Sequence, residues 1–467
     1  MAQEKTSAQA RVNKITEGVI WQQLLIFFFP ILFGTFFQQL YNAADAMIVG
    51  RFVGKEALSA VGGGTGTVIQ VLVGFFVGLS SGATVIISQY YGAKREEMVG
   101  YAVHTSIAFS ILAGIAMMVC GILAAPAVLR AMDTPAEVME PSILYIRIYF
   151  AGIIGNLIYN MGSGILRAVG DSKRPLYFLI VSCLANIVLD VVFVVELKMG
   201  VAGAALATIL SQALSAVMVI VVLMRTQDMH HLDLRKIGID RRMLGRIIRI
   251  GLPAGLQSIM YSSSNVIIQA SVNSLGTNTV AAWTAYSKID SVFWMIVNAF
   301  GISVTTFVGQ NYGAGKNDRV HKGVRVCMGL TFGATFLISF LLYNWGTICY
   351  ELFTTDAQVV KIGIDMLRYL VPVYFTYVAI EILSGALRGV GDCWIPTVIC
   401  CVGVCVLRIV WIVAAVPLRK DIFNIMFSYP LTWVVTSILF IIYYLFFSRL
   451  KRNSLRKTNR AEESSAA

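Results

Sequence analysis

In the first half of this 467-residue sequence, two acidic residues interrupt long apolar stretches. Asp45 lies in LYNAADAMIVG, inside the first such stretch, and Asp190 ends CLANIVLD in the fifth. An Asp inside a membrane costs roughly 2.5 to 3.5 kcal/mol on insertion scales, so both positions indicate a function. For Asp190 there is a plainer alternative, in which it lies near the outer end of its helix and is hydrated, because Glu196 and Lys198 follow closely.

Two neutral polar residues are expected beside these carboxylates. Asn186 precedes Asp190 by one helical turn and therefore shares its helix face. Thr208, in GAALATIL of the sixth stretch, adds a hydroxyl. We expect Asp45, Asn186, Asp190 and Thr208 to form one polar site. Their oxygen atoms suit a small hard cation such as Na⁺, or a proton held by one carboxyl, and no other metal is expected.

The second half of the sequence places different polar residues in its apolar stretches. Glu381 in YVAIEILSGALRG and Arg408 in CVLRIVWIV either pair with each other or line a substrate cleft. Lys288 and Asp290 are a further candidate for an intramembrane pair. The remaining cleft candidates, on the first and seventh stretches, are Gln38, Gln257 and Asn265.

The composition is that of a membrane protein. Hydrophobic residues make up 57% and charged residues 13%, against about 25% charged in soluble domains. Runs of about 20 apolar residues, enough to cross a hydrocarbon core of roughly 30 Å, recur along the chain, and Gly74, Gly78 and Gly82 have the spacing that lets helices approach closely. Alternating β-barrel strands are absent. We predict an all-α integral membrane protein with twelve transmembrane helices, near residues 24–50, 57–90, 99–124, 140–166, 175–196, 201–224, 247–274, 280–311, 321–345, 361–387, 396–417 and 422–447.

Two motifs occur twice in one register. LRAVGDSKRP at 166–175 returns as LRGVGDCWIP at 387–396, and QYYGA at 89–93 returns as QNYGA at 310–314. The spacing indicates a duplicated unit of about 220 residues, hence two parallel six-helix bundles related by a pseudo-twofold axis along the membrane normal. We interpret LRxVGD as a structural corner in preference to a substrate contact, because its Gly and Asp suit a turn and a cap before the next helix.

Lys and Arg concentrate in alternate loops, in the linker after the sixth predicted helix and in the tail, whereas the loop MDTPAEVME at 132–140 is acidic. The positive-inside rule therefore places both termini and the linker in the cytoplasm. The predicted organisation is a cytoplasmic N-terminal segment at 1–20, an N-terminal lobe at 21–224, a cytoplasmic basic linker at 225–246, a C-terminal lobe at 247–448 and a cytoplasmic basic tail at 449–467.

Several function classes are disfavoured. The net charge of +12 sits in these membrane-flanking loops, so nucleic acid is not expected as a partner. GGGTG at 62–66 lacks the Gly-Lys-Ser/Thr of a phosphate loop, and no HExxH or nucleophile and base pair occurs, so the protein is not expected to be an enzyme or to need a cofactor. The expected partners are the lipid bilayer and small molecules.

Taken together, the twelve predicted helices, the two repeated motifs, and Pro30 followed by Asp45 resemble the multidrug and toxic compound extrusion (MATE) family. The resemblance covers about residues 15 to 450. It implies an antiporter that exchanges inward-moving H⁺ or Na⁺ for outward-moving organic compounds, often cationic and amphipathic, by alternating access.

The resemblance also implies roles for particular residues. The cation site of such transporters matches Asp45, Asn186, Asp190 and Thr208, and Pro30 matches a proline at which the first helix bends. One branch of the family has an acid in the seventh helix, but GLPAGLQSIMYSSSN here contains none, so a sodium site of that type is in doubt.

Two alternatives remain open at this stage. A lipid-linked oligosaccharide or lipid flippase of the same superfamily would need a basic cleft, for which only Arg408 and Lys288 are available. A scaffold or intramembrane enzyme is the other. We expect a monomeric multidrug exporter of the bacterial cytoplasmic membrane, with H⁺ or Na⁺ as the coupling ion.

Overall fold

The computed structural model describes residues 14–451, and in this range the chain forms helices and their connections, with no strand. The predicted N-terminal segment and basic tail fall largely on residues 1–13 and 452–467, which lie outside the described residues. The first half of the described chain contains α1 (Lys14–Glu17), α2 (Ile20–Phe52), α3 (Lys55–Gly62), α4 (Gly64–Gly92), α5 (Glu96–Ala131), α6 (Ala136–Ala151), α7 (Ile153–Ala168), α8 (Lys173–Asp190), η1 (Val191–Glu196) and α9 (Gly200–Arg225).

The second half follows the linker, which includes the single turn η2 (Leu234–Lys236). Its helices are α10 (Arg241–Asn273), α11 (Thr277–Gly313), α12 (Asn317–Glu351), α13 (Ala357–Leu370), η3 (Val371–Val373), α14 (Phe375–Gly389), α15 (Trp394–Cys400), η4 (Cys401–Val406), α16 (Leu407–Ala415), α17 (Ile422–Ile442) and η5 (Tyr443–Phe447). We call α2–α9 the N lobe and α10–α17 the C lobe.

The predicted all-α membrane fold is confirmed. Nine helical segments in the described range are long and apolar enough to cross a membrane, and two bent pairs raise the number to eleven. The pairs are α6 with α7, bent by 49°, and α13 and η3 with α14, bent by 52°. The predicted seventh span is helical within α10, but the Gln, Ser, Asn and Arg side chains of this helix make it too polar to count by apolarity alone.

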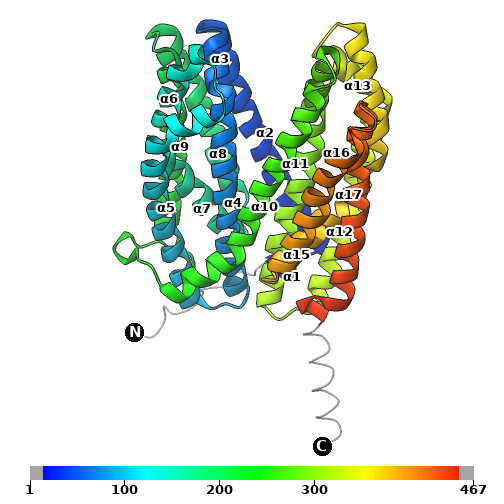
Figure 1. Ribbon diagram of the computed structural model, residues 1–467. Helices are drawn as coiled ribbons and strands as arrows, with labels where there is room; N and C mark the ends of the chain where they lie inside the picture. Colours follow the sequence, from blue (N-terminus) through cyan, green and yellow to red (C-terminus); the bar gives the residue numbers. More distant parts are fainter. Residues whose placement is uncertain (1–13, 452–467) are drawn as a thin grey trace, which may run out of the picture.

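The two lobes stand side by side and approach each other at one end only (Figure 1). They lie apart around α3, α6 and α13, which we call the separated end. They meet around α1 and α15, which we call the joined end. Each lobe has its own large hydrophobic core, and the core of the C lobe also takes in the first turns of α2.

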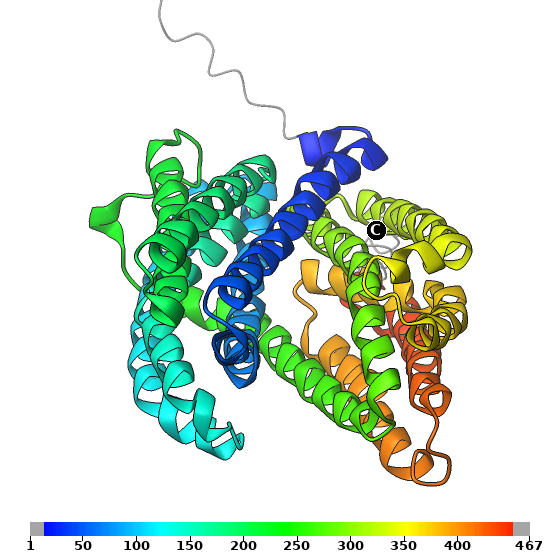
Figure 2. The ribbon, with the colours of Figure 1, turned by 90° about the horizontal axis from the view of Figure 1, so that it is seen from above.

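The first helix of each lobe packs on the opposite lobe. In α2, which runs between the two groups of helices in Figure 2, the Phe28 ring stacks on Phe300 of α11 with 4.0 Å between centroids. In α10, Gly255 lies against α4 so closely that a Cβ placed on Gly78 would be 2.4 Å from its backbone nitrogen. The predicted close approach along Gly74, Gly78 and Gly82 is therefore confirmed, and its partner is the other lobe.

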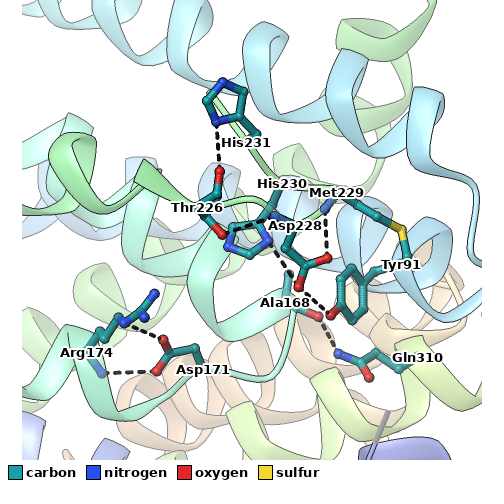
Figure 3. Close-up of polar contacts among 10 residues, drawn as sticks. All are labelled: Tyr91, Ala168, Asp171, Arg174, Thr226, Asp228, Met229, His230, His231 and Gln310. Atoms are coloured by element: carbon teal, nitrogen blue, oxygen red, sulfur yellow. Dashed lines mark hydrogen bonds and ion pairs between the residues drawn. The ribbon is translucent and has the colours of Figure 1, made fainter. Parts of the chain in front are cut away.

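The two repeated motifs bond to each other across the joined end. Gln310 Nε2 donates to the carbonyl oxygen of Ala168 at 2.6 Å (Figure 3). Gln89 Nε2 donates to the carbonyl oxygen of Gly389 at 2.7 Å. Gln89 and Gln310 open the two QxYGA motifs, while Ala168 and Gly389 hold the same place in the two LRxVGD motifs. Each lobe therefore contributes one donor and one acceptor, and we call this reciprocal pair the crossed lock.

The backbones are in close contact beside the crossed lock. A Cβ placed on Gly92 would lie 2.0 Å from the carbonyl oxygen of Gln310, and one on Gly313 would lie 1.9 Å from that of Gln89. No side chain fits at such distances, so both positions require glycine in this conformation.

The LRxVGD segments form the expected turns. Gly170 and Gly391 have φ values of +103° and +79°, in the region that favours glycine. Asp171 accepts hydrogen bonds from the backbone nitrogens of Lys173 and Arg174 at the start of α8, but Asp392 instead accepts from the Tyr443 hydroxyl at 2.8 Å.

The linker before α10 is fixed to the N lobe at the joined end. The Tyr91 hydroxyl donates to the Asp228 carboxylate at 3.0 Å (Figure 3), and the backbone nitrogen of Asp233 donates to His104 Nε2 at 3.0 Å. His230 beside Asp228 is buried, with 5% of its surface exposed. Burial lowers the pKa of the His230 imidazole, and the Asp228 charge opposes this shift.

Candidate functional site

The structure brings the four predicted cation-site residues into one lobe on three mutually packed helices. Asp45 comes from α2, Asn186 and Asp190 from α8, and Thr208 from α9. All four side chains are buried. The Asp190 side chain has 0% of its surface exposed, so the alternative of a hydrated residue at a helix end is wrong.

Tyrosines on two helices complete this cluster. Tyr41, one turn before Asp45 on α2, lies near Asp45, Thr208 and Ser211. Tyr145 of α6 also lies near Asp45 and Thr208. Asp45 and Asp190 are themselves close enough for their charges to interact. Sequence reasoning did not find the tyrosines, although the four-residue spacing of Tyr41 and Asp45 was a usable signal for a shared helix face.

Several polar atoms of the cluster have no hydrogen-bond partner in residues 14–451. They are both carboxylate oxygens of Asp190, Oδ1 of Asp45, both side-chain polar atoms of Asn186 and the Tyr41 hydroxyl. Buried polar groups are nearly always satisfied, because leaving one unpaired costs about 1 to 3 kcal/mol. A site with two carboxylates, an amide oxygen and hydroxyls therefore fits a small hard cation or a proton as its ligand.

The described residues contain no cluster of three or more His, Cys, Asp or Glu side chains suited to a metal such as zinc.

Asp190 also marks an irregularity in the helix. It is the last residue of α8, which continues directly as the π-helical turn η1 (Val191–Glu196). Such turns are rare and occur often at functional sites, because they leave the regular ladder of backbone hydrogen bonds. Nothing in the sequence indicated this turn.

The two candidate acids of the C lobe, Asp290 and Glu381, have hydrogen-bond partners. Asp290 accepts from the Trp294 indole nitrogen at 2.6 Å and from the Tyr374 hydroxyl at 2.5 Å. Glu381 accepts from the Tyr377 hydroxyl at 3.3 Å. These aromatic partners were missed, because Tyr374 is remote from Asp290 in sequence and aromatic residues are common throughout the chain.

Neither of the two candidate ion pairs in this lobe forms within residues 14–451. Lys288 is exposed and makes no ion pair with Asp290 in the described part of the chain. Residues two apart on a helix point in different directions, which explains the error. Arg408 is buried, lies over the Tyr429 ring at 4.1 Å and does not pair with Glu381.

Of the other cleft candidates, one is hydrogen-bonded within the C lobe and two are exposed. Gln257 Nε2 donates to the Cys400 sulfur at 3.2 Å, and Tyr261 bonds the same sulfur at 2.8 Å. Gln38 and Asn265 are exposed on α2 and α10. Pro30 lies inside α2, which continues as one helix on both sides of it.

Comparison with known proteins agrees with this architecture. A family model described as MatE matches residues 30–192 and 253–414, once in each lobe. The probable multidrug resistance protein YoeA of Bacillus subtilis is 29% identical and covers 96% of this chain and 98% of its own. The probable multidrug resistance protein YpnP of the same organism is 28% identical over 80% of this chain and 84% of its own.

A solved structure shows the same fold. It is described as the outward-facing conformation of a multidrug resistance MATE family transporter of the MOP superfamily, and it superposes with a TM-score of 0.87 at 23% identity. That match covers 97% of this chain and 100% of the other. The family match spans both lobes and most of the membrane-embedded chain, and we conclude that this protein belongs to the MATE family.

Proposed function

We propose that this protein is a secondary active multidrug efflux antiporter, working as a monomer in a bacterial cytoplasmic membrane. It exchanges inward-moving H⁺ or Na⁺ for outward-moving organic compounds that are often cationic and amphipathic. The family, and its relatives described as probable multidrug resistance proteins, support the substrate class. The observation that carries the proposal is the contrast between lobes, in which Asp45 and Asp190 are buried with unpaired oxygens while Asp290 is fully hydrogen-bonded.

The joined end faces the cytoplasm in this proposal. Basic residues lie in the turns and first helical turns beside the crossed lock, namely Lys173, Arg174, Lys316 and Arg319. The basic linker lies at the same end. The positive-inside rule assigns such short basic connections to the cytoplasm. The structure then corresponds to a state closed toward the cytoplasm by the crossed lock.

The cation site and the joined end are connected through α2. Its last third carries Tyr41 and Asp45, whereas its first third packs on the C lobe through Phe28 and Phe300. Binding of a cation neutralises carboxylates whose burial is costly, and this changes how α2 packs against α8 and α9. Because the same helix contacts both lobes, its rearrangement alters the lobe interface and the access to the substrate, with Pro30 as the point of bending.

The driving force depends on the charge carried by the substrate. Each elementary charge that moves inward gains roughly 2.3 kcal/mol per 100 mV. If one monovalent cation leaves for each ion that enters, no net charge moves, and the ion gradient alone drives export.

The alternative of a flippase for an anionic lipid carrier is less well supported. It would need basic side chains directed at the cargo, but Arg408 is buried against Tyr429 and its Nη2 donates to Thr432 at 3.4 Å.

The test is efflux of a fluorescent cationic dye from cells expressing Asp45→Asn. This variant keeps the shape of the side chain but removes its charge, so coupled efflux should be abolished while membrane insertion stays normal. Asp365→Asn, at an exposed site on α13, is the matched control and should export like the parent protein. Normal efflux by Asp45→Asn would remove the assignment. Proteoliposomes with separately imposed pH and sodium gradients then identify the coupling ion.

A further inference from the structure

A cavity with a basic lining lies at the joined end, beside one arm of the crossed lock. Its volume is about 530 Å³. Its walls come from the last turns of α4, the first turns of α10, the turn between α14 and α15, and the residue Arg449 after η5. It therefore borders both lobes, next to the bond from Gln89 to Gly389.

Three arginines surround this cavity. Arg246 and Arg249 are three residues apart on α10 and so share a helix face. Arg449 lies beside the turn between α14 and α15, with its Nη1 3.9 Å from a Cβ placed on Gly391. None of the three forms an ion pair with a carboxylate within residues 14–451. Arg246 donates to the Tyr90 hydroxyl, which holds its side chain at the cavity wall.

One acid, Asp392, also lines the cavity, but its carboxylate already accepts hydrogen bonds. Asp392 Oδ2 accepts from the Tyr443 hydroxyl at 2.8 Å and from the backbone nitrogen of Arg449 at 3.4 Å. Asp392 is 5% exposed. Three arginines against one aspartate leave the lining positively charged, and guanidinium groups match phosphate oxygens in geometry and charge.

Part of the cavity lining is apolar. Trp394 and Ile395, at the start of α15, are 48% and 47% exposed, and Ile86 and Ile250 form part of the walls. Tryptophan beside basic residues is typical of the level at which lipid headgroups meet the hydrocarbon core. A ligand with one anionic phosphate and an adjoining apolar part fits this combination.

The corresponding place in the other half is built differently. Gly170 corresponds to Gly391 in the repeat. A Cβ placed on Gly170 would lie 3.1 Å from the Ile15 side chain. Lys316 Nζ donates to the Thr16 carbonyl oxygen at 3.0 Å, and Arg319 Nη2 donates to that of Ile15 at 3.1 Å. There the chain's own helix α1 covers the turn and receives the basic side chains, whereas the turn at Gly391 faces the arginine-lined cavity.

We propose that this cavity binds the phosphate headgroup of an anionic phospholipid from the cytoplasmic leaflet, with Arg246, Arg249 and Arg449 holding the phosphate oxygens. The choice of leaflet rests on the proposed function, which turns the joined end to the cytoplasm. Because the lining comes from both lobes, the bound lipid favours the state in which the crossed lock is closed.

The proposal is tested with purified full-length protein in a neutral detergent, by native mass spectrometry during titration with phosphatidylglycerol, phosphatidylcholine or inorganic phosphate. The parent protein should bind phosphatidylglycerol in preference to phosphatidylcholine. The triple variant Arg246→Gln, Arg249→Gln, Arg449→Gln should bind it on the order of a hundredfold more weakly, since each of the three basic residues near an anionic headgroup contributes about fivefold.

A second triple variant controls for total charge. Arg235→Gln, Arg241→Gln, Arg242→Gln removes three exposed arginines of the same linker region that do not line the cavity, and it should bind like the parent. If the first triple variant does not fold, Arg449→Gln alone should still weaken binding about fivefold.

Equal loss in both triple variants, or no loss in the first, overturns the proposed site. If inorganic phosphate binds as tightly as phosphatidylglycerol, the proposal that the ligand is a phospholipid is wrong. Lipid binding does not require transport, so a failure here is distinguishable from a failure of the Asp45 assignment.

Discussion

The close contact beside the crossed lock predicts that a single methyl group on each side will force the joined end open. A carbon and a carbonyl oxygen approach to about 3.3 Å. The added Cβ atoms in Gly92→Ala and Gly313→Ala would start at 2.0 and 1.9 Å from the opposing carbonyl oxygens, so the backbones must separate by about 1.3 Å. This shift lengthens the neighbouring bonds of 2.6 and 2.7 Å beyond the limit of about 3.5 Å for a hydrogen bond.

The expected energetic effect follows from the two lost bonds. Each contributes about 0.5 to 1.5 kcal/mol, so the closed state loses about 1 to 3 kcal/mol, which is about 5- to 150-fold in the closed-to-open ratio. Hydrogen–deuterium exchange of the segments 89–95 and 310–316 in the double variant should accelerate by that factor.

The matched control is Gly100→Ala combined with Gly329→Ala. These glycines lie in α5 and α12, and a Cβ on either meets nothing within 4 Å. Alanine there should leave exchange at the joined end unchanged. If the Gly92 and Gly313 variants exchange at the same rate as this control, the crossed lock does not hold the lobes together.

Three further variants test other contacts. Gly78→Ala places a Cβ 2.4 Å from the backbone of α10 and should lower the thermal denaturation temperature. Tyr374→Phe removes the hydroxyl that donates to Asp290 and should cost about 1 to 3 kcal/mol of stability, whereas Tyr343→Phe, at an exposed site, should be neutral in the same thermal assay. The pKa of His230 in the folded protein lies below the pKa of a histidine in the unfolded chain. The unfolded state therefore binds more protons as pH falls through about 6.5, and the stability of the folded protein decreases there. His230→Asn should reduce this loss of stability when melting temperatures at pH 7.5 and 5.5 are compared.

The residues of the N-lobe cluster could be singled out from the sequence, because an acid in an apolar stretch is a strong signal. Asp45 and Asp190 stood out for this reason, and helical spacing added Asn186. The π-helical turn after Asp190 could not be predicted, since it depends on how α8 packs and its letters, VVFVVE, are ordinary for a membrane helix.

Contacts between segments that are remote in the sequence could not be predicted either. The repeated motifs indicated a duplication, but the sequence did not show that Gln89 bonds to the LRxVGD turn of the other half. The candidate pairs suggested by sequence proximity or charge, such as Lys288 with Asp290, do not form, because direction on a helix and aromatic neighbours decide which groups meet.

The crossed lock has the geometry of an isologous dimer contact. In such an interface residue i of one copy meets residue j of the other, and j meets i. One half-length unit with a single glutamine and a single turn carbonyl already encodes both bonds when two copies face each other. The two halves of the chain share this symmetry at the glutamines and glycines, whereas Asp45 and Asp190 belong to one half only.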